Sequence, residues 1–306
     1  MRLLVTGASG FIGRHVLALL RERGVPAWTL GRSLPADWPA DRHVACDLLA
    51  DADGCAHALR RLAPSHLLHL AWVTDPAGYQ TSPLNARWQT ATQQLARAFA
   101  QAGGRHMVVA GSCAEYDWSQ GWCHEDTTPL LPATPYGAAK NATRRWLQAH
   151  AGALGLRLTW GRIFFPFGPG QAPQRLIPAL VCALQGRRAL FPVQALQRRD
   201  FIAAPDVAQA LWILLQTPAS GCYNISSARP VAIAELVRML AHRLDVDPAP
   251  LLALAVGELQ QPALVAGDNA RLRALGWEAC AALDVGLAAA ADTAPSMVST
   301  VADDGR

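Results

Sequence analysis

The chain has 306 residues with a formal net charge of +4; 51% of its residues are apolar and 16% are charged. This composition is typical of a compact globular protein and excludes disordered, collagenous and disulfide-scaffold classes. The basic residues comprise 26 Arg and a single Lys, Lys140. The arginines form isolated pairs with no aromatic run between them, so no nucleic-acid surface is expected.

The first half of the chain alternates short apolar runs with amphipathic stretches. This alternation predicts six βα-type repeats, and therefore a doubly wound parallel α/β sheet. The predicted strands are 3–5, 27–30, 66–71, 106–110 and 157–164, with a further strand-like stretch before Asp47. The predicted helices are 11–23, 56–62, 85–102 and 135–151.

The pattern changes after residue 165, where a loop rich in Pro and Gly interrupts the alternation. Shorter helices are expected at 177–184, 206–215 and 233–244. We therefore expect a nucleotide-binding domain at 1–165, rejoined by about 191–225. Residues 166–190 and 226–290 are expected to form a smaller mixed α/β C-terminal lobe that binds the substrate, and 291–306 a flexible tail.

A glycine-rich turn, G-x-x-G-x-x-G, stands between the first strand and the first helix. Glycines let the backbone approach a pyrophosphate closely, and the N-terminus of a helix presents free N–H groups to it. An ordinary tight turn is the alternative, but the position favours dinucleotide binding in a Rossmann fold. The residues expected to contact the cofactor here are Gly7, Ser9, Gly10, Phe11, Ile12 and Gly13.

The end of the second predicted strand lacks the acidic residue that would bind an adenosine ribose. Arg32 and Ser33 stand there instead, and Arg14 follows the glycine turn. These side chains suit a 2′-phosphate, so NADP(H) is predicted in preference to NAD(H), which stays possible. The alternative is that Arg32 is a solvent-facing loop residue. Asp47 and Leu48 are placed to contact the adenine.

A second constellation consists of Tyr136 and Lys140, four residues apart on one predicted helix, and Ser112 at the end of an earlier strand. Side chains at this spacing share a helix face. An ammonium beside the phenol is expected to lower its pKa towards a useful range. The three residues are therefore predicted to transfer a proton at a carbonyl or alcohol.

The chain resembles an extended short-chain dehydrogenase/reductase, of the NAD-dependent epimerase/dehydratase family that acts on nucleotide sugars. The resemblance runs from residue 3 to about 277. Its motifs are T6-GASGFIG, D47-L, H69-L-A, Asn85, Ser112, Y136-GAAK, Arg162, G168-P, R199-D-F, D206-V, Y223-N-I and L275-G-W.

The resemblance implies roles for particular residues. Ser112 and Tyr136 would contact the reacting oxygen, and Lys140 would also hold the nicotinamide ribose. Leu70 and Ala71 would lie along the cofactor, and Arg199 would face the diphosphate of the substrate. The helices 85–102 and 135–151 would pair two copies into a homodimer.

Departures from the family pattern narrow the expected reaction. The 4,6-dehydratases have Asp-Glu directly after the catalytic hydroxyl residue, and Cys113 and Ala114 replace them here. Phe165 replaces an Asn that grips the substrate in many relatives, within an apolar wall that suits a deoxysugar or is simply core. The residues expected around the substrate are Trp72, Cys113, Ala114, Glu125, Phe165, Arg175 and Arg199.

The seven cysteines are widely spaced and contain no C-x-x-C pair. This spacing predicts neither a disulfide framework nor a zinc site, and no metal is expected. No apolar run reaches the ~20 residues that span a bilayer, and no signal peptide is recognised, so a cytoplasmic protein without membrane contact is expected.

Together these features predict NADPH-dependent reduction of a nucleoside-diphosphate-linked keto-sugar. A 4-keto-6-deoxyhexose on a route to a deoxysugar or polysaccharide is the expected substrate. The alternative is a nucleotide-sugar epimerase that reduces its bound cofactor transiently. A more distant alternative is a regulatory protein that binds NADPH without catalysis.

Overall fold

The computed structural model describes residues 1–218, 220–257, 262–280, 283–284 and 286–287. The described chain is built on a seven-stranded parallel sheet in the order β3-β2-β1-β4-β5-β7-β11. Its strands are β1 Leu3–Thr6, β2 Ala27–Gly31, β3 His43–Ala45, β4 His66–His69, β5 His106–Ser112, β7 Arg157–Ile163 and β11 Gly221–Ile225. The strand order reverses between β1 and β4, so the predicted doubly wound sheet is confirmed. The tail predicted at 291–306 lies outside the described residues.

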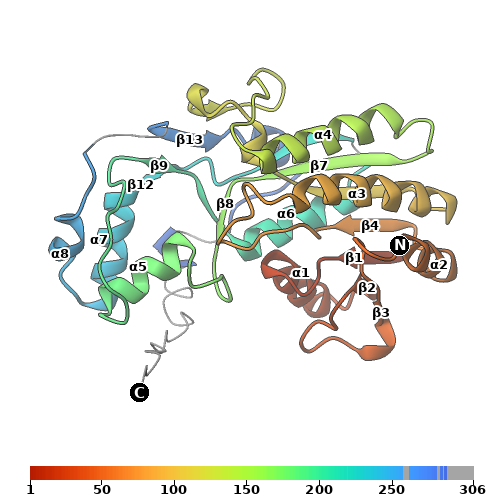
Figure 1. Ribbon diagram of the computed structural model, residues 1–306, viewed down its shortest axis with the longest axis horizontal. Coiled ribbons are helices and arrows are strands. Elements are labelled where there is room, and N and C mark those ends of the chain that lie inside the picture. Colours follow the sequence, from red (N-terminus) through yellow and green to blue (C-terminus); the bar gives the residue numbers. More distant parts are fainter. Residues whose placement is uncertain (219, 258–261, 281–282, 285, 288–306) are drawn as a thin grey trace, which may run out of the picture.

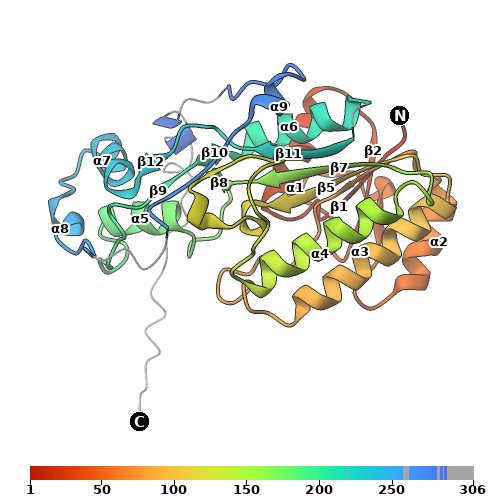
Figure 2. The same cartoon turned by 90° about the horizontal axis from the view of Figure 1, so that it is seen from above.

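Helices cover both faces of this sheet (Figure 2). One face carries α2 Ala52–Leu62, α3 Leu84–Gln101 and α4 Pro135–His150, and the other carries α1 Phe11–Glu22 and α6 Ala204–Gln216. Alternate strand residues serve the two cores: Leu67 and Met107 pack beneath the first group, and Leu68 and Val108 beneath the second. Burial on both faces explains why these strands read as unbroken apolar runs.

The remaining elements form a smaller lobe at one end of the sheet, on the far side of β8 (Figure 1). Its helices are α5 Leu176–Leu184, α7 Ile233–Leu244 and α8 Ala249–Leu252, while α9 Ala270–Arg273 lies against β11. Two short sheets, β10-β8 and β12-β9-β13-β6, join the lobe to the main sheet. Their strands are β6 Trp122–Cys123, β8 Phe165–Phe167, β9 Arg198–Arg199, β10 Phe201–Ala203, β12 Val231–Ala232 and β13 Leu264–Gly267. The second sheet is mixed, because β12 alone runs antiparallel to its neighbour.

Several boundaries differ from those that the sequence predicts, each for a local reason. Helix α2 begins four residues earlier than predicted, because the Asp51 carboxylate caps it by accepting from the Gly54 N–H at 2.8 Å. Strand β5 continues to Ser112, through pairing with β7. Strand β11 is absent from the predicted alternation and pairs in parallel with β7.

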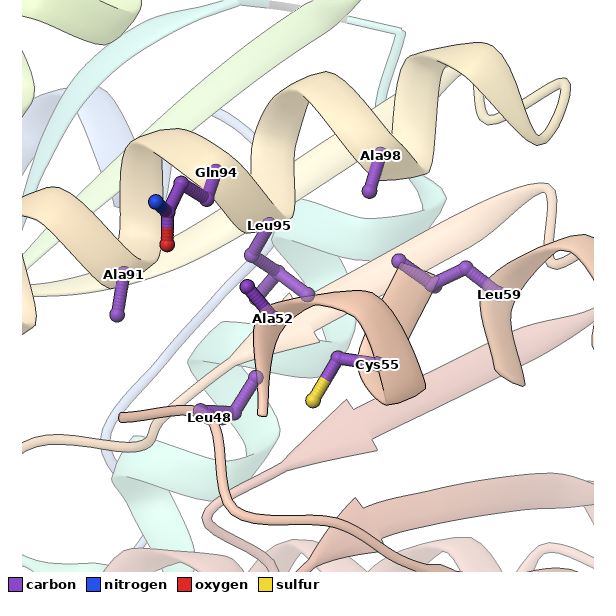
Figure 3. Close-up of a pocket in the computed structure, with 8 residues that line it drawn as sticks. All are labelled: Leu48, Ala52, Cys55, Leu59, Ala91, Gln94, Leu95 and Ala98. Carbon is purple, nitrogen blue, oxygen red and sulfur yellow. The ribbon is translucent and has the colours of Figure 1, made fainter. Parts of the chain in front are cut away.

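The cysteine spacing predicts no disulfide framework, yet the described chain contains one disulfide. Cys46, just after β3, forms a disulfide with Cys55 in α2, nine residues away. Closing a loop of this size lowers the conformational entropy of the unfolded chain and so stabilises the folded state by about 2–3 kcal/mol. Figure 3 shows Cys55 beside Leu48, in a crevice between α2 and α3. The spacing gave no sign of this bridge, because the turn after β3 is what brings the two residues together.

The other cysteines of the described chain, Cys113, Cys123, Cys182, Cys222 and Cys280, are free. Within the described ranges no helix has both the length and the hydropathy to cross a bilayer. The described part of the chain also contains no group of three or more His, Cys, Asp or Glu residues placed to hold a metal ion.

Candidate active site

The site lies at the carboxyl ends of β1, β4 and β5, beside the point where the strand order reverses. Buried His69 ends β4 and joins three elements, because its ring bonds the hydroxyls of Thr6 at 2.7 Å and Thr92 at 3.0 Å. Burial, aided by the Lys140 charge, lowers the pKa of His69 to about 3. The imidazole is therefore neutral at physiological pH and ties the end of β4 to β1 and α3.

The glycine turn packs against the end of β4 as closely as backbone allows. Gly7 has φ +70°, and a Cβ there would lie 2.5 Å from the Ala71 nitrogen. A Cβ on Gly13 would lie 2.3 Å from the Gly7 oxygen. Helix α1 starts at N-cap Gly10 without a side-chain cap, which leaves its first N–H groups available. This geometry fits a dinucleotide pyrophosphate.

The side chains predicted around the adenosine come from the ends of β2 and β3 and from α1. Arg32 and Ser33 are exposed at the end of β2. The Asp47 carboxylate accepts from the Leu49 N–H at 2.8 Å, which shapes the loop after β3. The Arg14 side chain packs on Gly170, because a Cβ added to Gly170 would lie 2.2 Å from Arg14 Nη1. This arginine therefore lies against the loop that follows β8.

Ser112 and Tyr136 come together because α4 begins directly against the end of β5. Thr134 caps α4 by accepting from the Gly137 N–H at 3.1 Å. A Cβ on Gly137 would lie 2.1 Å from the Ala114 oxygen, so only glycine permits this approach. The Ser112 side chain hydrogen-bonds the Tyr136 phenol. The predicted pair is thus in contact.

Tyr136 differs from the expectation in the direction of its pKa shift. Burial raises the pKa of Tyr136, and the hydrogen bond to Ser112 offsets the rise only in part. Lys140 does not reverse it, because its ammonium donates to the Ala110 carbonyl at 2.8 Å and lies 3.9 Å from the centre of the Trp72 ring. Burial lowers the pKa of Lys140 to about 7. At neutral pH the phenol keeps its proton and can donate it.

A buried carboxylate beneath this pair escaped the sequence reasoning. Glu115 accepts from the Ser112 N–H at 2.8 Å, from Trp160 Nε1 at 2.9 Å and from Arg162 Nε at 2.9 Å. Arg162 also donates to the Tyr116 hydroxyl at 2.9 Å. A lone arginine within an apolar strand requires a buried partner, which is the signal that would have pointed to Glu115.

Arg199 lies on the lobe side of the site and is only 5% exposed. Its Nη1 donates to the carbonyls of Arg198 and Pro262 at 2.9 and 3.1 Å, whereas Nη2 has no partner among the described residues. The Phe165 ring lies 5.8 Å from the guanidinium, and the Arg199 charge acts on the buried Cys113 thiol. A buried guanidinium with a spare donor suits an anion.

Of the other residues predicted to contact the substrate, only some lie at the site. Arg175 reaches the site, since it lies 4.7 Å from the Tyr79 ring, which meets Tyr136 edge to face at 4.9 Å. Glu125 instead accepts from the Asn224 N–H of β11 at 2.8 Å. Trp72 turns its face to the Lys140 ammonium.

The fold and this site together define a dinucleotide-binding enzyme of the short-chain dehydrogenase/reductase class. Residues 3–226 match the model of the NAD-dependent epimerase/dehydratase family. The chain therefore belongs to that family, as its sequence motifs predict.

Relatives in this family carry out several reactions. The chain is 29% identical to a UDP-glucose 4-epimerase from Azospirillum brasilense, over 90% of this chain and 86% of the relative. It is 28% identical to a GDP-6-deoxy-D-mannose reductase from Pseudomonas aeruginosa, over 90% of this chain and 91% of the relative. Membership of this family establishes an NAD(P)-dependent enzyme. The two relatives represent both the predicted reductase and the alternative epimerase.

Two solved structures show the same architecture. One is MoeE5 in complex with UDP-glucose and NAD, at 30% identity and TM-score 0.80, covering 95% of this chain and 98% of that one. The other is a dTDP-glucose 4,6-dehydratase from Streptomyces venezuelae with NAD bound, at 25% identity and TM-score 0.82, covering 95% and 96%.

Proposed function

We propose that the protein reduces a keto-sugar linked to a nucleoside diphosphate, with NADPH as the reductant. The observation that carries this proposal is the placement of Tyr136 at the start of α4, against the end of β5 and hydrogen-bonded to Ser112. A reduction at a ketone ends with a proton on the new alcohol, and the Tyr136 phenol, which keeps its proton at neutral pH, is the group placed to donate it.

The residues divide the work as follows. A reduced nicotinamide bound along the glycine turn supplies the hydride to the ketone carbon. Tyr136 donates its proton to the oxygen, and the Ser112 hydroxyl polarises the same oxygen. Lys140 stands one helical turn further along α4, where its ammonium is available to the cofactor ribose.

Arg199 is proposed to bind the substrate diphosphate. Its unpartnered Nη2 is held in a buried setting, where a charge-assisted bond is strong. MoeE5, which shares this fold, binds UDP-glucose. The apolar side chains of Phe165 and Cys113 next to Arg199 suit a sugar with few hydroxyl groups, and we propose a 4-keto-6-deoxyhexose on a route to a deoxysugar or polysaccharide.

The preference for NADP(H) is proposed from the end of β2, where Arg32 and Ser33 stand in place of an acidic residue. The solved relatives named above bind NAD, so this preference would be a local specialisation. We further propose a homodimer through α3 and α4, and a cytoplasmic location. The Cys46–Cys55 disulfide is unusual for a reducing compartment.

The direct test is consumption of NADPH with a panel of nucleoside-diphosphate 4-keto-6-deoxyhexoses. The proposal expects one equivalent of NADPH oxidised for each alcohol formed, and loss of this activity in Tyr136→Phe. Conversion of a nucleotide sugar without net oxidation would identify the epimerase instead. Equal kcat/KM for NADH and NADPH would contradict the cofactor preference alone. A cellular role that survives Tyr136→Phe would identify the non-catalytic alternative.

A further inference from the structure

Trp72 is fixed in an orientation that its hydrophobic character alone does not explain. Its Nε1–H donates to Asn85 Oδ1 at 2.9 Å, and Asn85 is itself buried and held by its Nδ2 on the carbonyls of Tyr79 and Ser82. The Trp72 ring also stacks on Trp88 of α3, with centroids 6.2 Å apart and planes 25° apart. One face of the ring is thereby committed to α3, and the indole cannot turn without breaking a buried hydrogen bond.

Lys140 rests close to that indole. Its ammonium lies 3.9 Å from the ring centre and donates to the Ala110 carbonyl at 2.8 Å. The aromatic face is electron-rich and attracts a cation most strongly where water is excluded, and Lys140 is 3% exposed. An ammonium has three donors, so the carbonyl and the ring leave a third for a ligand.

We propose that Trp72 is a positioning residue that holds the Lys140 ammonium, in its charged form, against the Ala110 carbonyl and ready for the cofactor. This inference rests on the proposed function for the role of Lys140. It assigns to Trp72 a different task from the substrate contact that the sequence suggested.

The other charged or titratable groups around Lys140 do not replace the ring. Glu115 raises the pKa of Lys140, but this carboxylate is already engaged by Arg162 and Trp160. His69 is neutral at physiological pH, and Tyr136 is a protonated phenol. Substitution of Trp72 therefore removes a contact of the Lys140 ammonium without leaving a buried carboxylate unpaired.

The single lysine makes a direct test possible. Protein grown with [13Cε,15Nζ]-lysine gives one side-chain signal, that of Lys140. In the wild-type protein we expect its ε-protons to lie upfield of their usual position, because they lie over an aromatic face. We expect this signal to titrate with a midpoint near pH 7. A signal at the usual shift in the folded wild-type protein would overturn the proposal without any variant.

Two substitutions of Trp72 distinguish the effect of its aromatic ring from that of its hydrogen bond to Asn85. In Trp72→Leu the titration midpoint should fall by about one pH unit, a tenfold weaker hold on the proton. Trp72→Phe keeps an aromatic face and should retain most of the wild-type midpoint. Trp88→Leu makes the same change one ring away and should leave the midpoint in place. An unchanged or raised midpoint in Trp72→Leu, or an equal fall in all three variants, would refute the proposal.

Kinetics supply a second readout that a merely structural role would not produce. Trp72→Leu should raise the KM for NADPH about tenfold and move the alkaline limit of kcat/KM to lower pH, whereas Trp72→Phe should restore both. The titration of Lys140 does not depend on turnover. If no keto-sugar is reduced while the titration behaves as expected, the proposed function fails and the role of Trp72 stands.

Discussion

The buried cations on the two sides of the site differ in their partners. On β7, Arg162 lies 2.9 Å from the Glu115 carboxylate and also donates to the Tyr116 hydroxyl. At the outer side, Lys140 has a carbonyl and a ring, and Arg199 keeps an unpartnered Nη2. A cation paired with a buried carboxylate cannot be removed without leaving that carboxylate uncompensated, whereas a cation left with donors to spare is available to a ligand.

The largest effect should follow from breaking the structural pair. Arg162→Met removes the closest cation from the buried Glu115 carboxylate and leaves it only the longer contact with Arg144 Nε at 3.8 Å, so it should lower the free energy of unfolding by about 3–5 kcal/mol in urea titrations. Arg145→Met, an exposed change in α4, is the matched control and should have little effect. Adding Glu115→Gln to Arg162→Met should restore more than half of the loss. A loss below about 1 kcal/mol would show that this ion pair is not the structural element we describe.

The next effect concerns the single lysine. Lys140→Arg should reduce kcat/KM for NADPH-dependent reduction about 100-fold, because a planar guanidinium cannot reproduce a compact ammonium between the Ala110 carbonyl and the Trp72 ring. Circular dichroism should show an intact fold. Arg145→Lys makes the reverse exchange on the exposed face of the same helix and should leave the rate unchanged. Near-wild-type turnover in Lys140→Arg would make the lone lysine a compositional coincidence.

Arg199→Met should produce a smaller and different change. The KM for the nucleotide sugar should rise about tenfold, as expected for loss of one charge-assisted hydrogen bond, with a smaller change in kcat. Stability should change little, because Arg199 has no carboxylate partner among the described residues. Arg198→Met removes an exposed neighbour and serves as the control. An unfolding loss as large as that of Arg162→Met would place Arg199 among the structural cations.

The sequence predicted the local features of the site better than the contacts between its elements. The glycine turn, the helix of Tyr136 and the parallel sheet follow from local spacing, so they could be predicted before any contact was known. The partners of Arg162 and Trp72 could not, because Glu115 and Asn85 reach them across separate elements. The direction of the Tyr136 pKa shift was missed for the same reason, since burial depends on packing.

The last prediction concerns the pH dependence of stability, which isolates the charge of Lys140. Burial lowers the pKa of Lys140 to about 7 in the folded protein, against an ordinary value of 10.5. Between these values the unfolded chain binds more protons than the folded one, so stability rises with pH across this window. The increase from pH 7 to pH 8 should be about 1 kcal/mol. Lys140→Met removes the titration, so the difference between the two proteins isolates it. Parallel stability curves for the wild type and Lys140→Met would show that Lys140 keeps its ordinary pKa in the folded protein. The distinction between the paired Arg162 and the cations with spare donors, Lys140 and Arg199, would then rest on geometry alone.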